Sequence, residues 1–147
     1  MREQLSQAVD VAIAKEKEAE AFYKEWAGKV QSTAVRALFA ELAATEHGHM
    51  EMLSHISPDE IVASDTGSEA ELDLSEHLVE ITANERMSLQ EAMILAMKRE
   101  DAAVGLYERL AGFGGEAKSL FTALANEERK HKRQIEAEYD DHILTDN

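Results

Sequence analysis

The chain has 147 residues, of which 44% are hydrophobic but only 5% aromatic, and its formal net charge is -15. An acidic chain of this kind lacks the basic patch that a nucleic-acid or anionic-membrane partner requires. The absence of cysteine excludes disulfides, thiolate zinc sites and cysteine-ligated iron centres. The length corresponds to about one domain, and the abundance of Ala, Leu, Glu and Lys favours an all-α fold.

The first part of the chain predicts a helical hairpin. A helix over about residues 3–27 carries apolar residues in steps of three and four, and Gly28 fits the left-handed position that ends it. A second helix runs from about Ser32 to Ile56, where Pro58 prevents its continuation. Because the connection between them is short, the two helices are expected to be antiparallel.

The last part of the chain predicts a second hairpin. Its first helix begins at Ser88, which opens a Ser-x-x-Glu capping box, and ends near Ala111 before Gly112. Its second helix runs from about residue 116 to 139. Another short connection makes this pair antiparallel as well.

A long segment, residues 57–87, separates the hairpins. It is acidic and poorly periodic at first, and its later part, LSEHLVEITANERM, is predicted to form a short helix. A connection of this length in a compact domain predicts a crossover along the bundle, with a disordered linker between separate hairpins as the alternative. The expected fold is one all-α domain over residues 1–147, an antiparallel four-helix bundle with hairpins over about 3–56 and 88–141.

No targeting or membrane segment is recognised in the sequence. Charged residues interrupt the first twenty positions before a signal-peptide core can form. No apolar run approaches the roughly 18 residues that a membrane span needs. The expectation is a soluble cytoplasmic protein.

The two hairpins carry the same residues at matching places. Glu46 and His49 form a Glu-x-x-His pair on the second helix, and Glu128 and His131 form another on the fourth. The surrounding residues repeat as well: Leu38-Phe39 and Leu42-Ala43 recur as Leu120-Phe121 and Leu124-Ala125, and Glu16, Tyr23 and Ala27-Gly28 recur as Glu100, Tyr107 and Ala111-Gly112. Each hairpin therefore offers a lone Glu on its first helix and a Glu-x-x-His on its second, which is the ligand set of two-metal carboxylate bundles.

The positions of these residues favour a metal site over a set of surface glutamates. All four Glu fall near mid-height of their helices and on the apolar faces, where a carboxylate is costly unless a cation compensates its charge. The i,i+3 spacing lets a Glu and a His reach one ion. The alternative is that these are surface Glu on Glu-rich helices. The predicted ligands of a two-metal centre are Glu16, Glu46, His49, Glu100, Glu128 and His131.

Neighbouring residues are candidates for supporting roles. Glu20, one turn from Glu16, is either an extra ligand, a gate or a solvated Glu, and Glu127 is a rival to Glu128 that lacks the repeat and the i,i+3 geometry. Tyr23 and Tyr107 lie two turns from the lone Glu residues on the same faces, where they either hydrogen-bond ligating carboxylates and so support the cofactor, or are ordinary buried tyrosines.

These residues resemble the ferritin-like superfamily, and within it the rubrerythrin-like branch, over the whole chain except residues 57–87. The resemblance implies two iron ions, with Glu46 and Glu128 bridging them and Glu16 and Glu100 as terminal ligands. It also places Tyr23 where rubrerythrins carry a Tyr beside the ligands. There are two departures. Ala103 stands where rubrerythrins carry a further Glu, and the electron-delivering rubredoxin domain is absent, so that efficient peroxidase turnover requires a separate reductant.

The leading hypothesis is a di-iron oxidoreductase that oxidises Fe(II) with O2 or reduces hydrogen peroxide, as a ferroxidase or a peroxidase with an external electron donor. Carboxylate and imidazole ligands suit iron or manganese and do not exclude zinc. One alternative is a non-catalytic iron carrier or storage-associated protein, motivated by the acidic surface and the missing electron-transfer module. Another is a metal-free helical adaptor. Ferritin-like bundles often pair, so the resemblance also implies a homodimer.

Overall fold

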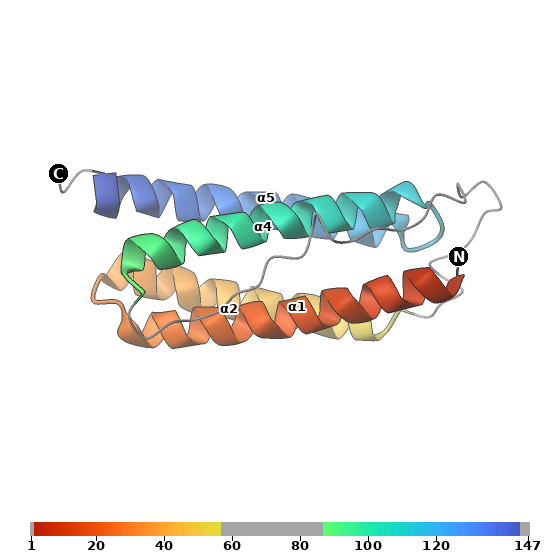
Figure 1. Ribbon diagram of the computed structural model, residues 1–147, viewed down its shortest axis with the longest axis horizontal. Coiled ribbons are helices and arrows are strands. Elements are labelled where there is room, and N and C mark those ends of the chain that lie inside the picture. Colours follow the sequence, from red (N-terminus) through yellow and green to blue (C-terminus); the bar gives the residue numbers. More distant parts are fainter. Residues whose placement is uncertain (1, 57–86, 145–147) are drawn as a thin grey trace.

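Four long helices make up most of the computed structural model, which describes residues 2–56 and 87–144. They are α1 (Arg2–Lys29), α2 (Thr33–Ser54), α4 (Leu89–Gly112) and α5 (Lys118–Tyr139), and a short π-helical turn (Asp140–Leu144) extends the last. Helices α1 and α2 form one hairpin, α4 and α5 form the other, and the two hairpins lie side by side along their length (Figure 1). The prediction of an all-α four-helix bundle is confirmed.

The hairpins meet through antiparallel neighbours. Helix α1 packs against α4 and α2 against α5, in addition to the contacts within each hairpin. Helix α2 ends at one end of the bundle, and α4 begins at the opposite end (Figure 1). The predicted crossover, the short helix within it and the effect of Pro58 lie outside the described residues, apart from Met87.

Serine caps start α2 and α4, and the cap of α4 was predicted. The Ser32 side chain accepts a hydrogen bond from the Val35 backbone at the start of α2. At the start of α4, Ser88 and Glu91 form both hydrogen bonds of the predicted capping box. These bonds satisfy backbone N–H groups that have no partner within the helix, so each helix begins where the sequence signal stands.

The predicted left-handed conformation of Gly28 was wrong, although α1 ends within two residues of the predicted end. Helix α1 continues through Gly28 to Lys29, and the Val30 N–H still bonds the Trp26 carbonyl. No left-handed residue is needed, because α2 starts after a short extended connection. Among the described residues, positive φ occurs at Gly114 (77°) and Gly115 (87°), in the α4–α5 connection, where glycine adopts this conformation without a steric cost.

The apolar core is divided into two clusters by a polar layer. One cluster joins the first half of α1 to the end of α4 and the start of α5, around Leu5, Leu110 and Phe121. The other joins the second half of α1 to the start of α2 and α4, around Tyr23 and Phe39. Both clusters contain residues of both hairpins, so burial of apolar surface holds the hairpins together on either side of the middle layer.

None of the helices in residues 2–56 and 87–144 combines the length and the apolarity that a membrane span requires.

Candidate metal centre

Acidic and histidine side chains from all four helices converge in the layer between the two apolar clusters. Each is at most 3% exposed. α1 and α4 each supply one Glu, while α2 and α5 each supply a Glu and a His spaced by three residues, which places both side chains on one helix face. The structure thus brings together the six predicted residues: Glu16, Glu46, His49, Glu100, Glu128 and His131.

The six residues form two overlapping groups of potential ligand atoms. One group contains Glu16, Glu46, His49 and Glu128, and the other contains Glu46, Glu100, Glu128 and His131. Within each group, one atom from every residue lies within 4.8 Å of the others. Glu46 and Glu128 belong to both groups, so these two carboxylates are placed to be shared, whereas the other residues each serve one group.

Both histidines direct their Nδ1 atoms into the polar layer. His49 Nδ1 lies 2.9 Å from a Glu128 oxygen, and His131 Nδ1 lies 3.0 Å from a Glu46 oxygen. The rings are stacked with their centroids 5.9 Å apart. Each histidine therefore reaches across to the carboxylate of the other hairpin, and the repeat seen in the sequence becomes an approximate twofold arrangement in space.

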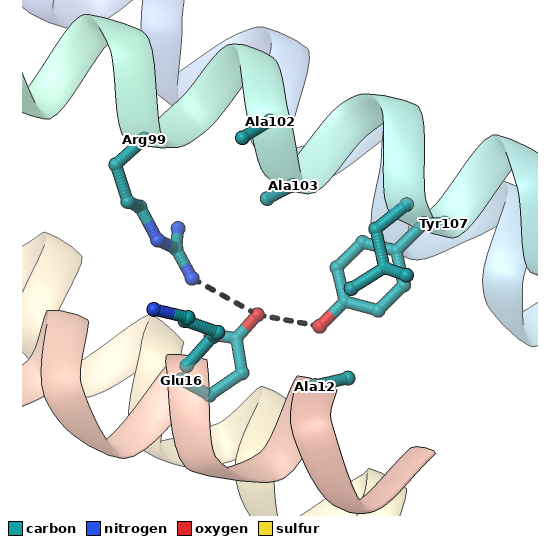
Figure 2. Close-up of a pocket in the computed structure, with 8 residues that line it drawn as sticks. Ala12, Glu16, Arg99, Ala102, Ala103 and Tyr107 are labelled. Atoms are coloured by element: carbon teal, nitrogen blue, oxygen red, sulfur yellow. Dashed lines mark hydrogen bonds and ion pairs between the residues drawn. The ribbon is translucent and has the colours of Figure 1, made fainter. Parts of the chain in front are cut away.

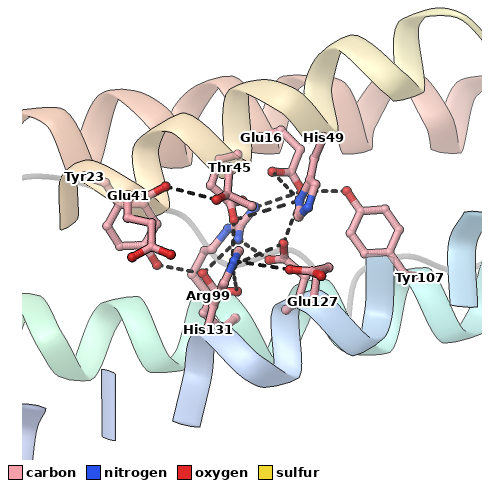
Figure 3. Close-up of polar contacts among 12 residues, drawn as sticks. Glu16, Tyr23, Glu41, Thr45, His49, Arg99, Tyr107, Glu127 and His131 are labelled. Carbon is pink, nitrogen blue, oxygen red and sulfur yellow. Dashed lines mark hydrogen bonds and ion pairs between the residues drawn. The ribbon is translucent and has the colours of Figure 1, made fainter. Parts of the chain in front are cut away.

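Two tyrosines link the hairpins through the same carboxylates. Tyr23 donates a hydrogen bond of 2.7 Å to Glu100, and Tyr107 donates one of 2.5 Å to Glu16. Both are buried and lie on opposite sides of the cluster (Figure 3). Each tyrosine serves the Glu of the other hairpin, and the hydrogen bond fixes the orientation of that carboxylate.

Sequence reasoning missed Arg99, whose guanidinium lies at the centre of the cluster (Figure 3). Its Nη2 lies 3.2 Å from Glu16 and 2.7 Å from Glu46. Its Nη1 lies 3.2 Å from Glu100 and 2.5 Å from Glu128. Arg99 is only 3% exposed. One cation therefore contacts all four carboxylates.

A signal for Arg99 was present in the sequence but was ambiguous. The apolar face of α4 passes through Ala96 and Ala103, and Arg99 stands between them at helical spacing. The residue at the matching place in the first hairpin is Lys15, which is partly exposed and pairs with Glu18. Because long basic side chains usually extend to solvent, the pattern alone does not distinguish the buried Arg from the exposed Lys.

The guanidinium divides the carboxylates into two classes by pKa. Burial raises the pKa of Glu16, but Arg99 and hydrogen bonds outweigh it and hold the value below its ordinary range. The same balance lowers the pKa of Glu100 to about 2. Burial, together with the neighbouring carboxylates, raises the pKa of Glu46 and Glu128 well above the ordinary value, against the opposing charge of Arg99. In each hairpin the pKa of one Glu is thus lowered and that of the other is raised.

His49 and the two tyrosines of the layer keep their protons at neutral pH. Burial lowers the pKa of His49, but the nearby Glu128 and Glu16 carboxylates raise it to about 9. Burial and the charge of Glu100 raise the pKa of Tyr23 well above its ordinary value. At neutral pH the layer therefore holds protons that a metal ion would replace.

The donor set fits divalent metal ions better than it fits Arg99. Nη2 of Arg99 is close enough to Glu16 and Glu46 for an ion pair, yet it makes no hydrogen bond of acceptable direction. Several buried acceptor and ring atoms also lack a directed partner: Glu16 Oε2, both oxygens of Glu46, Glu100 Oε2, Glu128 Oε1 and Nδ1 of His49 and His131. Buried polar atoms without a hydrogen-bond partner are rare in protein interiors. A metal ion can bind such oxygen and nitrogen atoms without requiring the planar geometry of a guanidinium.

A cavity of about 20 Å³ adjoins Arg99, Glu16 and Tyr107 (Figure 2). Its walls include Ala12, Ala102 and Ala103. This volume admits about one water molecule. The cavity lies where short side chains, among them Ala103, leave the space between α1 and α4 unfilled.

Two other acidic candidates lie outside both groups of ligand atoms. Glu20 pairs instead with Lys24 at 2.8 Å and with His47 at 3.0 Å. Glu127 has a side chain that is 49% exposed, and it approaches His131 only to 4.0 Å. Neither side chain joins the buried layer.

The family of the chain follows from a match over most of its length. The family model described as Rubrerythrin matches residues 7–139. The chain belongs to the rubrerythrin family. No curated protein and no solved structure matches it. The matched residues include both hairpins and therefore all six members of the cluster.

Membership of the rubrerythrin family and the buried cluster together indicate a metal-binding site. Carboxylate oxygens and imidazole nitrogens, including those that lack a hydrogen-bond partner here, are ligand atoms that divalent transition metals bind. The four-helix bundle thus contains a buried polar layer with one feature, Arg99, that the repeat does not explain.

Proposed function

We propose that this chain is a two-metal carboxylate oxidoreductase that uses iron to reduce hydrogen peroxide or O2. The observation that carries the proposal is the pair of overlapping ligand groups, in which Glu46 and Glu128 are common to both. Shared carboxylates support two ions held close together, and family membership makes iron the expected metal. When bound, two ferrous ions supply the two electrons that reduce one hydrogen peroxide molecule, with two protons, to water.

The protein supplies placement, charge and exclusion of water. Glu16, Glu46 and Glu128 with His49 would hold one ion, and Glu46, Glu128 and Glu100 with His131 would hold the other. The two apolar clusters on either side keep bulk water from the layer. Tyr23 and Tyr107, whose phenols donate to Glu100 and Glu16, keep those carboxylates in place.

We expect protein-bound Fe(II) to be oxidised by peroxide faster than free Fe(II), and this acceleration to be lost when Glu46 is replaced by Gln. The test is stopped-flow absorbance of ferric iron after anaerobic loading, with the exposed Glu41→Gln variant as a control on the same helix. Equal rates in the wild type and in Glu46→Gln would contradict the proposal.

A carrier or storage-associated protein is the second candidate function. The printed sequence contains no cysteine, so these residues cannot hold a rubredoxin-type iron centre that would return electrons to the site. Repeated turnover then needs an electron donor from outside this sequence. Many peroxide turnovers per chain with an artificial reductant would favour the enzyme, and a single oxidation followed by retention or release of Fe(III) would favour the carrier.

Metal affinity is expected to rise with pH up to about pH 9. The pKa of His49 is raised to about 9, so its ring is protonated at neutral pH, and Glu46 and Glu128 also hold protons. A metal ion must displace these protons, and each one released changes the affinity by about tenfold per pH unit. Calorimetric titration with Mn(II) at several pH values measures the slope. A flat profile would show that the ligands are already deprotonated before metal binds.

A further inference from the structure

The position of Arg99 divides its guanidinium between the two ligand groups. Nη2 contacts Glu16 and Glu46, which both belong to the first group. Nη1 contacts Glu100 and Glu128, which both belong to the second. Each terminal nitrogen of Arg99 thus contacts one of the two ligand groups.

Metal ions and this guanidinium would require the same carboxylates. Glu46 Oε2 and Glu128 Oε2 lie 2.7 Å and 2.5 Å from the Arg99 nitrogens. An ion bound to these carboxylates would share them with a fixed positive charge, and like charges held close together repel strongly in a buried site. Metal and Arg99 therefore compete for Glu46 and Glu128.

The guanidinium is a weaker partner for the cluster than two divalent ions. It brings a single positive charge to four carboxylates, and its Nη2 contacts lack the directed, paired hydrogen bonds that make arginine–carboxylate contacts strong. Without Arg99, however, Glu16 and Glu100, whose pKa values are lowered, would lose the guanidinium that contacts both of them. Arg99 therefore stabilises the carboxylate cluster when metal is absent, and metal ions stabilise it more strongly when they are bound.

We propose that Arg99 is a tethered cation that competes with metal ions for the four carboxylates and must withdraw before both ions bind. This inference rests on the proposed function. It makes Arg99 a positioning residue that sets the metal concentration at which the centre loads, because the free energy of moving the guanidinium is subtracted from that of metal binding. The cavity beside Ala12, Ala102 and Ala103 adjoins the side chain on the α1–α4 side but is too small to hold the guanidinium, so withdrawal requires neighbouring side chains to move (Figure 2).

The test compares Co(II) binding by four proteins, followed by visible absorption under anaerobic conditions. They are the wild type, Arg99→Met, Arg99→Lys and the control Lys98→Met, which removes an exposed positive charge from the same helix. We expect Arg99→Met to bind Co(II) at least tenfold more tightly than the wild type, with the same number of ions per chain. Arg99→Lys and Lys98→Met should remain near the wild-type affinity, because each keeps a cation in the cluster.

Thermal unfolding gives a second readout that is independent of activity. Metal-free Arg99→Met should melt below the metal-free wild type, and saturating Co(II) should close that difference. If Arg99→Met folds only when Co(II) is present, the proposal is supported in its strongest form, since metal then replaces the missing guanidinium.

Three outcomes would overturn the inference. Equal Co(II) affinity in the wild type and Arg99→Met, with two ions bound to each, would leave the proposed function standing and remove the role of Arg99. An equally large gain in Arg99→Lys would show that charge is not the cause. Absence of Co(II) binding in all four proteins would remove the proposed function as well, and would identify the layer as a metal-free ionic core.

Discussion

Replacing Glu46 with Gln is expected to abolish the loading of both metal ions. Glu46 belongs to both ligand groups, so its loss removes a donor from each. Removing even an outer hydrogen-bonding partner of a metal ligand costs about 10–100-fold in affinity, and loss of a shared ligand should exceed this. The variant should still fold without metal, because the raised pKa of Glu46 makes the native side chain neutral, and the amide has the same shape. Iron content after anaerobic Fe(II) loading and desalting measures the effect.

Two matched variants make this prediction specific. Glu16 belongs to only one ligand group, so Glu16→Gln should lose one ion and retain the other. Glu41 is exposed on the same helix as Glu46 and belongs to neither group, so Glu41→Gln should load as the wild type does. An equal loss of iron in Glu46→Gln and Glu16→Gln would show that Glu46 is not shared between two ions.

Replacing Phe39 with Ala is expected to lower the free energy of unfolding by about 3–5 kcal/mol, the usual cost of truncating a buried Phe. The Phe39 ring is fully buried and its centroid lies 5.6 Å from that of Tyr23, which in turn donates to Glu100. The substitution therefore leaves a cavity beside the tyrosine that supports the polar layer. Urea unfolding of the metal-free protein, followed by circular dichroism, measures the loss.

The repeat supplies a second test of this prediction. Phe121 matches Phe39, is equally buried and stacks on Tyr107, so Phe121→Ala should cost about the same. Met52 is 44% exposed, and Met52→Ala should change the free energy of unfolding by no more than about 0.5 kcal/mol. A loss below about 1 kcal/mol in both Phe variants would mean that these rings do not hold the core together.

The internal repeat explains why so much of the fold was accessible from the sequence. Matching Glu, His, Tyr and Phe residues in two hairpins predict a bundle, and the structure places them around one layer. The caps at Ser32 and Ser88 are local hydrogen-bond patterns, which short stretches of sequence encode directly. Gly28 failed as a signal because a glycine near a helix end permits a left-handed residue without requiring one.

Arg99 escaped prediction because its environment is created by tertiary packing. Nothing local distinguishes it from Lys15, its counterpart in the repeat, and only the meeting of four helices surrounds one of them with carboxylates. The cross-hairpin partners of Tyr23 and Tyr107 were out of reach for the same reason. A repeat predicts which residues are equivalent, but it does not predict which hairpin a side chain will contact.

Anomalous diffraction at the iron edge, from crystals of the protein loaded anaerobically with Fe(II), tests the two-metal centre most directly. The expected result is two iron peaks between the hairpins, each bound by one histidine and both in contact with Glu46 and Glu128, with the Arg99 head group withdrawn. A cluster without iron, in which Arg99 still contacts all four carboxylates, would contradict the centre and identify the layer as a metal-free ionic core.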